Sequence, residues 1–167
     1  MWLEGRNVMP YRNHPLPTRL YLGIADHFPA RRSEWVLAGI MVVWGSLLVG
    51  PVPVFAQSIA WSQMAAMMNE ATWGWLAIGV GTFRLLALII NGTFAGTWYG
   101  RWSPHVRAAA SFLTCFLWFQ ISFGLWASDA ATTGLAVYPG LLVLDAMNIV
   151  AAMKDAAGMD KAVSDGR

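Results

Sequence analysis

The feature that most constrains this chain is a long apolar run at residues 72–92, with a single cation, Arg84, near its middle. The run is about 20 residues long, which is the length that an α-helix needs to cross a bilayer core about 30 Å thick. Trp73 and Trp75 stand at its start, as in segments anchored at a membrane interface. A guanidinium at mid-membrane depth costs about 2.5–3.5 kcal/mol unless it finds a partner or water. The run therefore predicts a transmembrane helix and a buried partner for Arg84.

The composition extends this interpretation to the whole chain. Apolar residues make up 57% of the sequence and charged residues only 12%, about half the share of roughly 25% that is typical of soluble domains. Three further apolar segments are long enough to cross a membrane, at residues 35–55, 106–127 and 134–153. We therefore predict an all-α, polytopic membrane protein, with four transmembrane helices packed as a compact bundle in a domain over residues 34–154.

A short amphipathic helix is predicted before this domain, at residues 19–33. Three apolar residues recur there at every fourth position: Leu20, Ile24 and Phe28. Such a helix can lie on the inner membrane surface or pack against the ends of the spans, and the sequence leaves both placements open. At the two ends of the chain, residues 1–18 predict an irregular cytoplasmic tail, and residues 155–167 predict a polar cytoplasmic tail that is frayed and solvated.

The first span admits a second interpretation, as a cleaved leader. Two arginines at 31–32, an apolar run and the small-residue end Val-Phe-Ala at 54–56 resemble a signal peptide with its cleavage site. Against this, a leader of about 30 residues precedes the arginines, and Pro51 and Pro53 interrupt the end of the run. We favour an uncleaved span, and cleavage would leave three spans with the same topology.

The segment at 56–71 predicts an amphipathic helix at the outer surface, with Trp61 as an interfacial anchor. Its large apolar residues include Ile59 and three methionines, Met64, Met67 and Met68. Methionine thioethers are ligands that soft metals such as Cu(I) favour. However, the spacing is that of ordinary helical packing, and no His or Cys lies in the segment. We therefore predict no metal site here.

The basic residues predict the topology. Ten of the eleven lie before the first span, between spans two and three, or after span four: Arg6, Arg12, Arg19, Arg31, Arg32, Arg101, Arg107, Lys154, Lys161 and Arg167. The two remaining loops have none, and Arg84 lies within a span. The positive-inside rule then places both termini in the cytoplasm, across a bacterial inner membrane. Five arginines flank the predicted spans as candidate contacts to lipid headgroups: Arg19, Arg31, Arg32, Arg101 and Arg107.

A second charge, Asp145, is the predicted partner of Arg84. Spans two and four run in the same direction, with Arg84 twelve residues into one and Asp145 eleven residues into the other. At about 1.5 Å per residue, the two charges lie at nearly the same depth. Further polar side chains lie in these spans and in span three: Asn91, Tyr138, Asn148 and Gln120.

Two roles remain open for these polar groups. The first is a buried ion pair that fixes the register of the helices. The second is a proton or ion relay, or a polar lining that is exposed when several copies assemble. We favour the structural pair, because the two charges match in depth and are opposite in sign.

Other functional classes lack their usual residues. The histidines His14, His27 and His105 lie outside the predicted spans, so no intramembrane pair can ligate a haem. Cys115 is alone, and no nucleotide loop, zinc-protease motif or serine elbow is present. A net charge of +2 with no basic run argues against nucleic acid. We predict a non-enzymatic protein without cofactor or metal.

Four stretches carry a resemblance to known proteins: ADHFPARRSEW at 25–35, INGTF at 90–94, WYGRWSPHVRA at 98–108 and GLAVYPGLLVLD at 134–145. The pattern resembles small four-span membrane proteins of proteobacterial phages and prophages, a group of uncharacterised proteins that brings no catalytic residues. The resemblance covers most of residues 20–153 and implies action on the host inner membrane.

Three roles follow from that setting. The first is holin-like, in which copies self-assemble into lesions that release a lytic enzyme. The second is a membrane scaffold or accessory subunit of a larger complex, bound through the many aromatic residues. The third is a small ion channel or transporter, which the absence of internal repeats disfavours. The expected partners are the lipid bilayer and further copies of the chain or a membrane complex.

Overall fold

The computed structural model describes residues 15–93 and 98–165, and this part of the chain contains helices and no strand. Its elements follow in the order α1 (Leu16–His27), α2 (Arg32–Val49), η1 (Phe55–Gln57), η2 (Ile59–Trp61), α3 (Ser62–Met67), α4 (Glu70–Thr93), α5 (Trp98–Ala127) and α6 (Gly134–Ser164). Four of them, α2, α4, α5 and α6, are long and apolar enough to cross a membrane. The predicted all-α, four-span architecture with a short N-terminal helix is confirmed. This helix begins at Leu16, inside the predicted irregular tail, and ends at His27 instead of residue 33.

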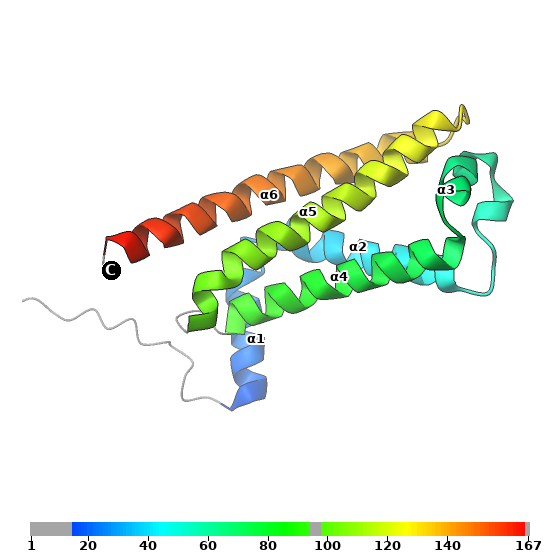
Figure 1. Ribbon diagram of the computed structural model, residues 1–167. Helices are drawn as coiled ribbons and strands as arrows, with labels where there is room; N and C mark the ends of the chain where they lie inside the picture. The colour runs from blue at the N-terminus through cyan, green and yellow to red at the C-terminus, as the bar shows by residue number, and fades with distance from the viewer. Residues whose placement is uncertain (1–14, 94–97, 166–167) are drawn as a thin grey trace, which may run out of the picture.

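The four long helices pack as two antiparallel pairs, α2 with α4 and α5 with α6, and α4 and α5 join the pairs (Figure 1). The α1 helix contacts α4 and lies across the end of the bundle where α2 begins and α6 ends. The segment from η1 to α3 lies at the opposite end (Figure 1). The bundle therefore has one end that carries α1 and the C-terminal part of α6, and another that carries the short helices.

Close packing of α2 on α4 depends on glycines. A Cβ added at Gly45 of α2 would lie 2.6 Å from the backbone oxygen of Gly74, and one added at Gly81 of α4 would lie 3.0 Å from the backbone oxygen of Ala38. Small residues at such positions let two membrane helices approach backbone to backbone, where dispersion contacts are densest. This contact sets the position of α4, and with it that of Arg84, one turn after Gly81.

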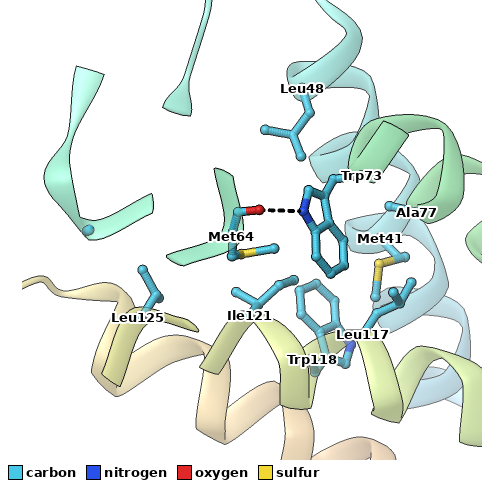
Figure 2. Packing of buried hydrophobic residues seen from close by; sticks show 10 residues of the cluster. Met41, Leu48, Met64, Trp73, Ala77, Leu117, Trp118, Ile121 and Leu125 are labelled. Atoms are coloured by element: carbon cyan, nitrogen blue, oxygen red, sulfur yellow. Dashed lines mark hydrogen bonds between the residues drawn. The ribbon is translucent and has the colours of Figure 1, made fainter. Parts of the chain in front are cut away.

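The apolar core lies toward the end that carries the short helices and brings together residues from five segments (Figure 2). Its largest members are Trp118 and Ile121 of α5, Met41 of α2, Met64 of α3 and Trp73 of α4. The Trp73 indole donates a hydrogen bond of 3.0 Å to the Met64 backbone oxygen. This bond ties α3 to the start of α4 and closes the core at this end.

The first span is shorter than predicted. The α2 helix ends at Val49, and Gly50 is already extended, so the predicted continuation to residue 55 is wrong. A proline disfavours helical geometry in the residue before it and lacks the amide hydrogen that a helix needs, and Pro51 and Pro53 follow here. The Glu70 carboxylate instead accepts backbone hydrogen bonds from Val54 (2.6 Å) and Phe55 (3.1 Å).

The outer segment at 56–71 also differs from the single amphipathic helix that its pattern predicts. It divides into η1, η2 and α3, and the Ser58 side chain accepts from the Ala60 amide at the start of η2. Met64 is fully buried against Gly124 of α5, whereas Met67 is exposed. The two methionines therefore lie in different environments, one in the core and one at the surface. This arrangement is typical of packing and does not bring the two sulfur atoms to a shared metal site.

Two spans are longer than predicted. The α5 helix already begins at Trp98, in the predicted loop, and contains Pro104. The α6 helix continues to Ser164, so the predicted frayed tail is helical as far as that residue. Alanine-rich sequence favours this extension, and Ala152 and Ala156 are buried against the rest of the bundle.

Candidate functional site

The two charges predicted at mid-membrane depth meet inside one chain. Arg84 of α4 and Asp145 of α6 are 1% and 0% exposed, and Arg84 Nη1 lies 2.5 Å from Asp145 Oδ1. The same Nη1 donates a hydrogen bond of 2.6 Å to Thr114 Oγ1 of α5. Three helices therefore converge on one guanidinium. Its charge is balanced by a carboxylate at the same depth, as a cation in this position requires.

The pair continues toward the end of the bundle that carries α1. Asn148, one turn after Asp145, donates from Nδ2 to Asp145 Oδ1 at 3.4 Å. Its own Oδ1 accepts a bond of 2.8 Å from the Ser33 hydroxyl in the first turn of α2. This file of side chains therefore connects the mid-membrane charges to Ser33, which is exposed at the helix end.

Several buried polar atoms beside this pair have no hydrogen-bond partner within the described part of the chain: Arg84 Nε and Nη2, Asp145 Oδ2, Ser111 Oγ and Trp118 Nε1. Ser111, Thr114 and Trp118 follow one another at helical spacing on α5, so they share the face that meets α4 and α6. A buried polar group without a partner costs about 1–3 kcal/mol. The pair is thus well balanced in charge but incompletely hydrogen-bonded.

A second cluster of charges lies one level closer to the α1 end. Arg107 of α5 is 2% exposed and binds Glu34 of α2 with two nitrogens: Nε lies 3.2 Å from Oε2, and Nη2 contacts Oε1. Its third nitrogen, Nη1, donates to Asp155 Oδ2 of α6 at 2.9 Å. Arg31 lies 3.8 Å from the same oxygen. Two arginines and two carboxylates balance here, and all three donor nitrogens of Arg107 are used.

The sequence predicts that Arg107 contacts lipid headgroups, and this prediction is wrong because Arg107 is buried and binds carboxylates of the chain. A bidentate carboxylate inside the protein is a stronger partner for a guanidinium than a hydrated headgroup. Arg31, predicted to lie at the same surface, is half-buried, and both burial and the nearby charge of Arg107 lower the pKa of its guanidinium. Arg32 is exposed and donates to the Pro29 backbone oxygen at 3.0 Å.

Two other predicted residues, Gln120 and Tyr138, are not part of these clusters. Gln120 is half-buried on α5. Tyr138 of α6 belongs to an aromatic cluster near the opposite end, where it meets Trp61 edge-on. The side chains of three further predicted residues fall outside the described residues: Arg19, Asn91 and Arg101.

The pattern missed three partners of these charges, Ser33, Glu34 and Asp155. A signal for Asp155 was present, because Asp145, Asn148, Ala152 and Ala156 recur at spacings of three or four, so this buried face runs past residue 153. Glu34 stands directly before the first apolar run. An acidic residue at this position is explained by its favourable interaction with the start of a helix, so it does not indicate a buried ion pair. Comparison with family models, curated proteins and solved structures finds no match to this chain.

Proposed function

We propose that this integral membrane protein is a non-enzymatic scaffold or accessory subunit of the bacterial inner membrane, which acts by binding other membrane helices side by side. The observation that carries this proposal is a row of exposed aromatic residues on α5. Its members are Phe112, Phe116, Phe119, Phe123 and Trp126.

The spacing of this aromatic row favours a helix as its partner. The residues follow at intervals of four, three, four and three, which is the 3.5-residue repeat of a seam between two helices. Phe119 stacks on Phe123 with centroids 6.1 Å apart, and Phe123 contacts Trp126 at 6.0 Å, so these three rings form a continuous ridge. An aromatic ridge offers large, rigid contact area at low cost in side-chain entropy.

The closed interior supports the same role. Arg84 of α4 and Asp145 of α6 are bound to each other within one chain, so the faces that these helices leave outside at this depth are apolar. Only 17% of the apolar window of α6 is buried in the chain, against 39–44% in the other three spans. A broad apolar surface of this kind suits lateral association in a bilayer.

The distribution of basic residues supports an orientation with both termini in the cytoplasm. Arg31, Arg107 and the basic residues of the C-terminal part of α6 lie at the α1 end, whereas the loops at 50–69 and 128–133 contain no Lys or Arg. Basic residues near the ends of spans are retained on the cytoplasmic side.

A holin-like function is the second candidate, and the unpartnered polar atoms around Arg84 and Asp145 favour it. If α4 and α6 separated during self-assembly, these atoms would gain water and line a lesion. The resemblance to phage proteins supports this setting. The role requires breaking the buried pair in every copy, and for this reason we place it second.

Inducible expression of the full chain in a bacterial host separates the two candidates. We expect the wild type to accumulate without loss of membrane potential and to co-purify with one host or phage membrane complex in a mild detergent. The variant F116A/F119A/F123A should lose the complex, whereas Phe83→Ala, an exposed phenylalanine on α4, should retain it. A sudden collapse of potential at a fixed time after induction would overturn the scaffold role and favour lesions.

A further inference from the structure

A cavity of about 450 Å³ lies near the end of the bundle opposite α1, between α2, η2 and the start of α6. Its size falls within the range of ligand sites, about 300–1,000 Å³. Trp44, Trp61 and Tyr138 form an aromatic wall, and the Thr132 and Thr133 hydroxyls lie where α6 begins. We propose that this cavity binds one phospholipid of the outer leaflet, selected for an ammonium headgroup.

The aromatic wall is held in a fixed arrangement. Trp61 lies against Trp44 with centroids 6.3 Å apart at 55° and meets Tyr138 edge-on at 6.1 Å and 73°. On their other sides, Trp61 stacks on Phe55 at 5.6 Å and Tyr138 on Trp118 at 6.0 Å. The cavity wall is therefore preorganised, and binding need not order these side chains.

The depth of the cavity fits a lipid. Its lining runs from Thr132 at the loop before α6 to Leu141, and from Trp44 to Ile40 on α2. Seven residues of helix rise about 10 Å, so the cavity reaches from the membrane interface into the hydrocarbon core. Polar hydroxyls stand at the interfacial end and aliphatic side chains at the deep end, which is the polarity of a headgroup followed by an acyl chain.

The absence of basic residues among the described residues around the cavity determines which lipid headgroup fits it. None of the residues that line the cavity is charged, and the loops at 50–69 and 128–133 contain one acidic residue, Asp129, and no basic one. The faces of indole and phenol rings carry negative charge density that attracts an ammonium group. A zwitterionic lipid with a primary ammonium fits this environment, whereas an anionic lipid of the glycerol type finds no cation.

The test is native mass spectrometry of the full chain in a neutral detergent, titrated with phosphatidylethanolamine or phosphatidylglycerol of identical acyl chains. We expect one phosphatidylethanolamine per chain, held about fivefold to tenfold more tightly than phosphatidylglycerol, as cation–π attraction allows. Equal retention of the two lipids, or no retained lipid, would overturn the proposal.

Two matched valines of α6 locate the site. Val137 lines this cavity, whereas Val143 is equally exposed on α6 and lines a separate groove with Met147 and Val150. V137W should fill the cavity and abolish lipid retention, and V143W should leave it unchanged. The opposite order would place the lipid in the other groove and contradict our assignment.

Circular dichroism and gel filtration test whether both tryptophan variants fold. If V137W does not, Thr133→Val provides the second measurement, because Thr133 is exposed and the change preserves side-chain shape. It should narrow the preference for phosphatidylethanolamine without altering helix content. An unchanged preference in this variant would exclude a headgroup contact at the start of α6.

Discussion

The two buried charge clusters solve the same electrostatic problem in different ways. Arg84 lies deeper and has one carboxylate, Asp145, with two of its three nitrogens unpartnered in the described chain. Arg107 lies nearer the helix ends and uses all three nitrogens, on Glu34 and Asp155. Arg84 thus makes fewer hydrogen bonds than Arg107 and has less access to water. Its charge therefore depends more strongly on a single carboxylate, that of Asp145.

The largest effect is therefore expected at the deep pair. Asp145→Ala should lower the free energy of unfolding by about 3–5 kcal/mol, because it leaves a buried guanidinium without its counter-charge. The measurement is unfolding by sodium dodecyl sulfate in mixed micelles, followed by circular dichroism.

A compensated double variant shows whether the loss comes from the orphaned charge. In R84M/D145L both charges are replaced by apolar side chains of similar volume, a change that is often neutral for buried ion pairs. We expect it to regain most of the stability that Asp145→Ala loses. If the double variant were as unstable as the single one, the pair would have to contribute more than mutual neutralisation.

The second largest effect is expected at Arg107. Arg107→Met leaves Glu34, 3% exposed, without the guanidinium that binds both of its oxygens, and should cost about 2–4 kcal/mol in the same assay. Arg32→Met is the matched control, because Arg32 is exposed and, among the described residues, bonds only a nearby backbone oxygen. The control should change stability by less than about 0.5 kcal/mol. Equal losses in both variants would mean that burial of Arg107 adds nothing.

The same two clusters mark how far sequence reasoning reaches. The depth of Arg84 and Asp145 follows from counting residues along two parallel spans at a fixed helical rise. Their environment could thus be anticipated without knowing how the helices pack. The four spans were predictable for the same reason, because length and apolar composition are local properties.

The Arg107 cluster could not be derived in this way. It depends on α5 beginning at Trp98 and on α6 continuing to Ser164, both in segments whose polarity predicts loop or tail. Tertiary contacts, such as burial of Ala156 and the Arg107–Asp155 bond, stabilise that extension of α6. The aromatic row on α5 had a sequence signal, its 3.5-residue spacing, but which helix face lies outside follows only from packing.

A smaller loss of stability is expected when a hydrogen bond between two helices is removed, and it can be compared with the loss of a bond within one helix. Thr114→Val removes the hydroxyl that accepts from Arg84 Nη1 at 2.6 Å and should cost about 0.6–1.7 kcal/mol, the range measured for interhelical bonds in membranes. Ser122→Ala is its control on the same helix, because the Ser122 hydroxyl bonds only the Trp118 backbone oxygen. A cost for Ser122→Ala as large as that for Thr114→Val would show that the bond to Arg84 is not special.

The smallest effect is expected at Asp155, the most exposed charged residue of either cluster at 49%. Asp155→Asn removes a charge from Arg107 and Arg31 but leaves the Glu34 bonds intact, so it should cost at most about 1 kcal/mol, as exposed pairs do. That cost should shrink further in 1 M salt, where the screening length falls to about 3 Å. Asp145→Asn should keep its full cost at the same salt concentration, because solvent ions do not reach a side chain that is 0% exposed. A salt-sensitive loss of stability at Asp145 would mean that water and ions enter the bundle to mid-membrane depth. The two clusters would then be equally accessible to solvent, which would favour an open, lesion-forming state.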